Sequence, residues 1–584
     1  MKFRSVLLLA VLALPLACDR GLKDGEYTLT VLSTNDVHAQ WFDSTYIGTG
    51  LKKSLFAVNT YVDSVRRADG AENVLLVEVG DCLQGDNAAY YYNYVDTLSP
   101  HLFPRLLHYM QYDAVVWGNH DVETGHKVYD RVNRELEQYG IPFMAGNAIR
   151  DDNGKTYFPL YKIVKKAGLK IAILGYENAN IKAWLAQEVW SGMHFDRIVD
   201  HVQQDVDAVR AKERPDVVIV GVHSATGTGD GTNAEAEGMD VFNLVKGVDW
   251  VLTSHDHKPL VENRDSMVLM NSGSHARFLA HGKMKLKVEK GQVVSKSFQA
   301  DLIPVDPAKA DPAMRAAFHK DFEAVKAFTL QEVGVLNTQL RTRDAYIGMS
   351  DYINLIHTLC IRQKPAQLSI AAPLTYNGTV APGILVFNDL FTIYPFENQL
   401  YVITMTGEEI VRYLEASYDR WIQTYTKPGD HILNIVPKEN LRSQQKGWSF
   451  TGLSYNFDSV AGLNYTVDVT KPRGARVQVG TLADGTPFDP AQTYNVAVTS
   501  YRASGGGNLL DEIGVDTDQI DGRVVARYPE IRNILYDYLM EKGSIDPEDI
   551  SDPKVIGSWR FVPEKLAGPV LKADLALLFG PEKP

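Results

Sequence analysis

The first half of the chain alternates short apolar runs with amphipathic stretches. The apolar runs are rich in β-branched residues and have the length of buried strands, whereas intervening stretches such as Leu55–Arg67 and Val199–Lys212 have helical spacing. Strands separated by helices favour an α/β layered domain with buried sheets, which we place at residues 27–305. The predicted strands are Thr28–Ser33, Val74–Val79, Ala114–Trp117, Lys170–Leu174, Val217–Val222 and Trp250–Thr253.

The rest of the chain predicts a second domain, because 584 residues exceed what one core usually serves. Asp311-Pro312 followed by Ala313–Phe328 predicts a capped helix. After it, Pro and Gly punctuate a second, α+β pattern, and the last residues are weakly patterned, with a short helix near Ala573–Phe579. The predicted boundaries are a linker helix at 306–343, a second domain at 344–550 and a C-terminal tail at 551–584.

The N-terminus has the features of an export signal. Lys2 and Arg4 precede the apolar run Val6–Leu14, which is too short to span a bilayer as a helix. Leu16-Ala17-Cys18 resembles the bacterial lipobox, in which the Cys is lipidated; the alternative is an ordinary signal peptide with a chance Cys. We therefore expect a lipoprotein signal peptide at 1–18, a polar tether at 19–26, and a lipid on Cys18 that anchors the protein to a membrane of the cell envelope, periplasmic or surface-exposed.

The charge limits the partners. The formal net charge is −13, and no basic footprint is present, so a nucleic-acid polymer is not expected as a partner. No feature indicates a protein partner. Only Cys82 and Cys360 remain after the N-terminus, and one distant pair is no disulfide framework, so we expect two buried thiols.

Five predicted strands end in residues that can bind metal. A lone Asp or His at a strand end is commonly a turn or cap residue, but turn chemistry does not explain five in succession. Ligands bind beyond the carboxyl ends of strands in α/β sheets, and imidazole with carboxylate suits Zn, Mn, Fe or Co. The scarcity of Cys argues against a closed structural zinc site. The strand-end residues are Asp36 and His38, Asp81, Asn119 and His120, His223, and His255 and His257.

These motifs resemble those of the calcineurin-like metallophosphoesterases. D-x-H, G-D, G-N-H-[DE], G-x-H and G-H-x-H occur in that order across residues 27–260, with Ser254 in place of the usual last Gly. The resemblance implies a four-layer α/β/β/α domain and two divalent metal ions, with Zn, Mn, Fe and Co all open. The implied ligands are Asp36, His38 and His257 for one ion, Asn119, His223 and His255 for the other, and Asp81 as the bridge.

The resemblance also implies the chemistry. Two ions about 3.5–4 Å apart lower the pKa of water between them and clamp phosphate oxygens, so that hydroxide attacks phosphorus. His120 would meet the phosphate and stabilise or protonate the leaving oxygen. Its carboxylate partner would be Glu123, with Asp121 as the alternative.

Motifs of the second half resemble the C-terminal domain of the 5′-nucleotidase family, which extends the resemblance over residues 27–540. They are Ala371-Ala372-Pro373, Tyr394–Asn398, Gly462–Tyr465 and Tyr501–Asn508. The resemblance implies that Phe396 and Tyr501 sandwich the base, with Tyr394 as a rival for the first position and core packing as the other reading of Phe396. Asn398 could hydrogen-bond the base. In that family the two domains rotate, and we place the hinge at Ala313–Phe328.

One departure leaves the substrate open. The family motif N-G-G-x-I-R stands here as Asn377-Gly378-Thr379-Val380-Ala381, so the substrate-binding Arg is missing. Arg341 and Arg343 could supply positive charge, or could simply be solvated. Tyr501–Asn508 and Gly462–Thr470 look closer to the branch that acts on 2′,3′-cyclic nucleotides and 3′-nucleotides.

The sequence therefore predicts a hydrolase that removes phosphate from nucleotides outside the cytoplasm, of the 5′-nucleotidase type. The alternatives are a 2′,3′-cyclic-nucleotide 2′-phosphodiesterase/3′-nucleotidase and a UDP-sugar hydrolase. A non-catalytic lipoprotein that captures nucleotides is the alternative from another class. No Gly-rich Walker loop is present, which disfavours phosphoryl transfer to another nucleotide.

Overall fold

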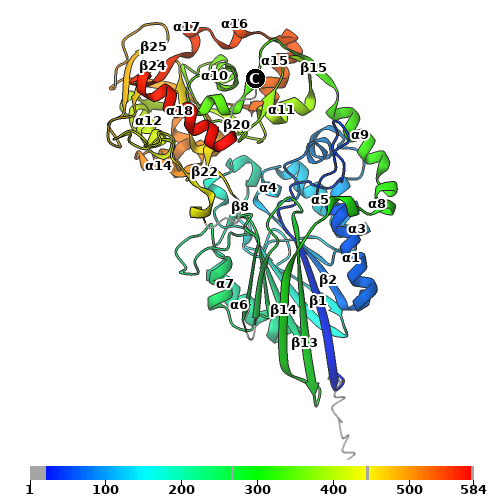
Figure 1. Cartoon of the computed structure of the whole chain (residues 1–584). Coiled ribbons are helices and arrows are strands. Elements are labelled where there is room, and N and C mark those ends of the chain that lie inside the picture. The colour runs from blue at the N-terminus through cyan, green and yellow to red at the C-terminus, as the bar shows by residue number, and fades with distance from the viewer. Residues whose placement is uncertain (1–21, 265–266, 442–445, 581–584) are drawn as a thin grey trace, which may run out of the picture.

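The computed structural model describes residues 22–264, 267–441 and 446–580. The described chain forms two domains, one above the other in Figure 1. The first, coloured blue to green, contains the long strands, and the second, coloured mainly green to red, contains shorter strands and more helices. Helices α8 (Pro312–Ala317) and α9 (His319–Thr329) run along one side, from the first domain towards the second.

Two six-stranded sheets form the centre of the first domain. Each has parallel strands in its middle and antiparallel strands at one or both edges. In spatial order, the first sheet contains β14 (Gln292–Pro304), β13 (Phe278–Glu289), β1 (Gly25–Thr34), β2 (Val74–Val79), β3 (Ala114–Val116) and β4 (Phe143–Met144). The second contains β11 (Leu260–Arg264), β12 (Met267–Asn271), β10 (Trp250–Thr253), β9 (Val217–Val222), β7 (Leu169–Tyr176) and β6 (Tyr161–Lys166). All six predicted strands are present.

The two sheets pack face to face, and helices cover both outer faces. Leu29 and Val77 of the first sheet share one buried cluster with Ile171 and Trp250 of the second. The outer face of the first sheet is covered by α1 (Leu55–Asp69), α3 (Leu102–Tyr109) and α5 (His126–Gln138). The outer face of the second is covered by α6 (Ile198–Glu213) and α7 (Gly238–Leu244). The predicted four-layer α/β/β/α domain is confirmed.

The expected linker helix is two helices. The side chain of Asp311 caps α8 by accepting from the Ala313 amide, as expected, but Phe318 interrupts the helix with φ −107° and ψ 15°. Helix α9 is then fixed to the first domain, because Arg105 forms a bidentate pair with Asp321 at 2.6 and 3.1 Å. Its far end reaches the second domain, where the Phe328 and Phe387 ring centroids are 4.3 Å apart.

The main sheet of the second domain separates two clusters. Along β20 (Gln399–Thr406), Leu400 and Val402 face one cluster while Tyr401 and Ile403 face the other. Helices α10 (Asp351–Arg362), α11 (Phe387–Ile393) and α15 (Ile531–Lys542) cover the first side, and α12 (Gly407–Trp421) covers the second. The other strands of this sheet are β23 (Ser459–Ala461), β17 (Leu368–Ala371), β26 (Thr493–Thr499) and β27 (Val524–Glu530).

The residues expected to form a weakly patterned tail belong to this domain instead. Strand β29 (Gly557–Val562) pairs in parallel with β24 (Leu463–Asp468), which also pairs with β25 (Val477–Leu482). Helix α18 (Glu564–Phe579) is longer than predicted. It packs in the buried cluster that contains Trp559 and Phe561 of β29. The strand signal was present as alternation of Trp559 and Phe561 with exposed neighbours, but it is only a few residues long.

Cys82 and Cys360 are buried free thiols, as expected. Cys18 and the predicted signal peptide lie outside the described residues. Among the helices that the structure describes, none combines the length and the apolar character needed to cross a membrane.

Replacing Trp559 should destabilise the second domain. Its ring is 6% exposed and stacks on Tyr465 at 5.8 Å, so Trp559→Ala should lower the free energy of unfolding by about 3–5 kcal/mol. Differential scanning calorimetry of the full chain would show one transition shifted to lower temperature. Arg560→Ala, on the same strand but with an exposed side chain, should shift it little. Equal effects of the two substitutions would contradict a structural role for β29.

Candidate active site

The predicted metal ligands come together at the edge where the carboxyl ends of strands from both sheets meet. Asp36 and His38 follow β1, and Asp81 follows β2. Asn119 begins the short helix α4 (Asn119–Val122) just after β3. His223 follows β9 in the second sheet, and His255 and His257 follow β10.

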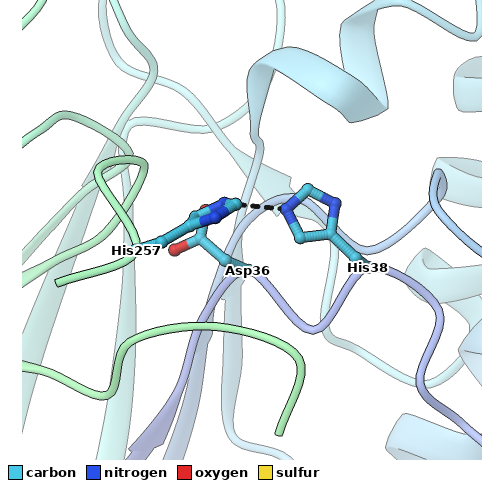
Figure 2. Close-up of side chains that lie close together, drawn as sticks. All are labelled: Asp36, His38 and His257. Carbon is cyan, nitrogen blue, oxygen red and sulfur yellow. Dashed lines mark hydrogen bonds and ion pairs between the residues drawn. The ribbon is translucent and has the colours of Figure 1, made fainter. Parts of the chain in front are cut away.

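Asp36, His38 and His257 form one group. Their ligand atoms all lie within 4.8 Å of one another. The Nε2 atoms of His38 and His257 are 3.0 Å apart, and Asp36 Oδ1 lies 3.6 Å from His257 Nε2 (Figure 2). The Asp36 carboxylate is held by the amide of His255 at 3.0 and 3.1 Å. One potential metal-ligand atom from each of these three residues thus lies close to the other two.

Asp81, His223 and His255 form the second group. His223 Nε2 lies 3.2 Å from Asp81 Oδ2, and Asn119 Oδ1 lies 3.0 Å from His223 Nε2 and 2.9 Å from His255 Nδ1. The Asn119 side chain therefore lies beside this group. The other oxygen of Asp81 accepts the His120 amide at 2.8 Å.

The backbone at these positions is unusual. Asp36, His38, Asp81, His255 and His257 have φ values of 48°, 47°, 61°, 68° and 56°. This left-handed region costs a non-glycine residue about 1–2 kcal/mol. Next to Asp81, a Cβ on Gly80 would stand 2.4 Å from His223 Nδ1, so only glycine fits there. Such strain is typical of functional sites, where the surrounding fold enforces it.

The electrostatics fit cations. Burial lowers the pKa of His38 well below its usual value and that of His257 to about 3, so both rings are neutral at pH 7 and offer lone pairs. Burial raises the pKa of Asp36 to about 7, although the charge of His223 opposes the shift. Burial also opposes ionisation of Asp81, yet the charges of His223 and His120 hold its pKa well below the usual range. The neutral imidazoles of His38 and His257 and the buried carboxylates suit divalent ions, and a cation bound at His223 would displace the proton that Asp81 stabilises there.

The two candidate partners of His120 have different positions. Glu123 Oε2 lies 2.6 Å from His120 Nδ1. Asp121 instead accepts backbone amides, those of Cys82 and Leu83 at 2.8 Å and that of Gly118 at 3.0 Å. Asp121 therefore secures the loop after β2, while Glu123 contacts the imidazole.

One cavity of about 610 Å³ connects this site with the second domain. Asp81, His120 and His257 line one part of it, and Phe396 and Tyr501 line the other. Two further aromatics that no motif indicated, Trp184 and Tyr455, also line it, and the Tyr455 ring centroid is 6.4 Å from that of Phe396. Tyr394 and Asn398 also line the cavity, with Asn398 Nδ2 3.4 Å from the Tyr394 hydroxyl, and Tyr394 is nearly fully buried.

Arg341 and Arg343 are not part of this cavity. They line a separate surface pocket with Lys572, and Arg341 Nε donates to Asp344 at 2.7 Å. The Lys and Arg side chains that line the central cavity are Lys258 and Arg502. Neither Arg341 nor Arg343 lines the cavity that holds the metal-ligand side chains.

His275 lies beside the first group without having been predicted. Its ring stacks on His38 at 5.0 Å, its amide donates to Asp36 O at 2.7 Å, and its φ is 56°. Burial lowers its pKa to about 4. No motif in the sequence marks it; the only local signal is a His in the loop that leads into β13.

Comparisons with known proteins identify both domains. The model of the calcineurin-like phosphoesterase family matches residues 29–259, and that of the 5′-nucleotidase C-terminal domain matches residues 329–512. The chain is 25% identical to the 2′,3′-cyclic-nucleotide 2′-phosphodiesterase/3′-nucleotidase of Haemophilus influenzae, over 95% of this chain and 90% of that protein. It is 23% identical to the trifunctional nucleotide phosphoesterase protein YfkN of Bacillus subtilis, over 95% of this chain but 40% of that longer protein. The crystal structure of the 5′-nucleotidase precursor from Thermus thermophilus has the same fold, with a TM-score of 0.59, 20% identity, and coverage of 92% of this chain and 100% of that one.

Removing one ligand from either group should remove one ion. We expect wild-type protein loaded with Mn²⁺ or Zn²⁺ and desalted to retain about two ions per chain, and His257→Ala and His223→Ala to retain about one. Inductively coupled plasma mass spectrometry gives the count. His194→Ala is the control, because His194 is exposed and pairs with Asp151 away from the site. Two ions retained in both ligand variants would refute the grouping.

Proposed function

Because this one chain joins a calcineurin-like phosphoesterase domain to a 5′-nucleotidase C-terminal domain, we propose that it is a metal-dependent hydrolase that removes phosphate from nucleotides. Both relatives described above carry names of nucleotide phosphoesterases. The observation that carries the proposal is the shared cavity, which has metal-ligand side chains in one wall and aromatic rings in another. A nucleotide has matching parts, a phosphate ester and a flat base.

At the phosphate end, Asp36, His38 and His257 would hold one divalent ion, and Asn119, His223 and His255 the other, with Asp81 between them. When bound, the ions would neutralise phosphate oxygens and activate water. His120 adds a proton donor: burial lowers its pKa, but the charges of Asp81 and Glu123 prevail and raise it to about 9. A protonated His120, oriented by Glu123, is suited to donate to a phosphate or leaving-group oxygen.

At the base end, Phe396 and Tyr501 would stack on the two faces of the base, and Tyr455 would complete the wall. Tyr501 is oriented by its neighbour Arg502, whose guanidinium lies 5.2 Å from the centre of the Tyr501 ring. Arg502 is itself fixed, since its Nε donates to Asp458 at 2.7 Å and its Nη2 to the Tyr455 carbonyl at 2.6 Å. Asn398 would reach the edge of the base.

The charges in the cavity favour a particular second candidate activity, that of a 2′,3′-cyclic-nucleotide 2′-phosphodiesterase, over hydrolysis of either 5′- or 3′-nucleotide monoesters. Arg502 is occupied by Asp458, and Lys258 points to solvent with 79% of its side chain exposed. Glu123, Glu235 and Asp256 line the same cavity. No free guanidinium is thus available, among the described side chains of this wall, to help bind a dianionic phosphate monoester. A cyclic diester carries a single negative charge and needs less compensation.

The location remains a prediction from the N-terminal sequence. We propose export through the signal peptide at 1–18 and attachment to a membrane by a lipid on Cys18, which places the enzyme in the cell envelope. The ions themselves remain open among Zn, Mn, Fe and Co.

Phosphate release from AMP, 3′-AMP and 2′,3′-cyclic AMP, measured with Mn²⁺ or Zn²⁺, tests the proposed function. A phosphatase-coupled assay is needed for the cyclic substrate, since its opening yields a monoester. We expect wild type to hydrolyse at least one of these nucleotides, and Asp81→Ala to lose at least about 10³-fold in kcat because it lacks the carboxylate between the ion groups. Wild-type protein that holds metal but releases nothing from this panel would favour the capture of nucleotides instead.

Removing the Tyr501 ring should weaken binding more than it slows chemistry. Stacking is worth about 1–3 kcal/mol, so Tyr501→Ala should raise KM for a nucleotide by about 10-fold or more. With p-nitrophenyl phosphate, which lacks a base, the loss in kcat/KM should be much smaller. Arg343→Ala is the control and should leave both substrates unaffected, because Arg343 lines the separate pocket. An equal loss on both substrates would argue against base stacking.

A further inference from the structure

His255 is oriented by residues of two loops, at Trp184 and Glu235. Its Nδ1 faces Asn119 Oδ1 at 2.9 Å, and its Nε2 faces Glu235 Oε1 at 3.4 Å. The indole of Trp184 stacks on its ring, with centroids 4.9 Å apart and planes at 22°. His223, by comparison, is fully buried and turns Nδ1 to the carbonyl of Val79 at 2.8 Å, within the sheet.

Glu235 is held firmly although its loop is rich in glycine. Its carbonyl accepts three hydrogen bonds, from the Ala225 amide at 3.1 Å, from Ser224 Oγ at 3.0 Å and from Asn178 Nδ2 at 3.0 Å. Its amide donates to Asn233 Oδ1 at 3.0 Å. With both backbone groups fixed, the half-exposed carboxylate starts from a defined place within reach of the His255 ring.

Trp184 is fixed by the turn before it. It follows the short 3₁₀ helix Ile181–Ala183, and its amide donates to the Ile181 carbonyl at 3.0 Å. Ile181 is fully buried in the first domain. Two residues further on, Ala186 packs in a buried cluster of the second domain, so the segment around Trp184 is held at both ends.

We propose that Glu235 and Trp184 are positioning residues that hold His255 ready to bind a metal ion. A histidine that binds metal through one nitrogen usually donates its other N–H to a carboxylate, which fixes the tautomer and the ring orientation. Glu235 takes that place opposite Nδ1, and Trp184 prevents rotation of the ring out of its plane. His255 has φ 68°, so its side chain starts from a strained backbone and gains from external support. The proposal rests on the metal-binding part of the proposed function.

Titration of chelator-treated protein with Mn²⁺, followed by electron paramagnetic resonance, tests this without any substrate. Wild type should bind two ions, the second of them giving the signal of an exchange-coupled pair. Glu235→Ala should lower the affinity for the second ion by about 10- to 100-fold, so that the coupled signal appears only at higher Mn²⁺ concentration. Glu235→Gln should lose less, because its amide oxygen can still accept from Nε2–H. Trp184→Ala should lower the affinity for the same ion, and Trp184→Phe should restore most of that affinity.

Asp230→Asn is the matched control. It removes an acid from the same loop, but Asp230 accepts hydrogen bonds from Thr228 and Thr232 rather than from His255, so both ions should be unaffected. Should Glu235→Ala fail to fold, as judged by circular dichroism, the affinities of wild type and Glu235→Gln for the second ion are compared instead. Unchanged affinity of the second ion in the Glu235 and Trp184 variants would overturn the proposal. That result leaves the proposed function standing, whereas a wild type with two ions and no hydrolysis of nucleotides overturns only the function.

Discussion

The site depends on a steric constraint: the ends of strands from two sheets must meet at one edge. Asp36 and Asp81 come from the first sheet, and His223 and His255 from the second. Left-handed backbone turns the side chains of Asp36, Asp81 and His255 inwards. The face-to-face packing of Leu29, Val77 and Ile171 holds the two sheets together against that strain. The buried apolar layer between the sheets thereby holds in place the strand ends that carry the polar ligands.

The sequence was sufficient to predict the layers and the gathering of the ligands. Strands such as Val74–Val79 are buried on both faces and read as continuous apolar runs, and polar residues directly after them must lie at the sheet edge. The residues alone do not choose between Asp121 and Glu123 beside His120, and the preference for Glu123 comes from the family resemblance. Both are near in sequence, and only the local turn, in which Asp121 points back to the amides of Cys82 and Leu83, separates them.

Residues on irregular loops could not be predicted, because no periodicity relates them to the site. Glu235, His275 and Tyr455 come from segments whose course depends on tertiary contacts. Similarly, nothing local marks Phe318 as the break between α8 and α9. Arg341 and Arg343 had suitable chemistry, but they line another pocket, together with Asp344 and Lys572.

The cavity has walls from two domains whose main buried clusters are separate. A molecule that fills it contacts both, and so becomes part of the interface between them. Its binding free energy then adds to the contacts that already join the two domains, such as those of Ala186 and Phe328. Occupancy should therefore couple the unfolding of one domain more tightly to that of the other.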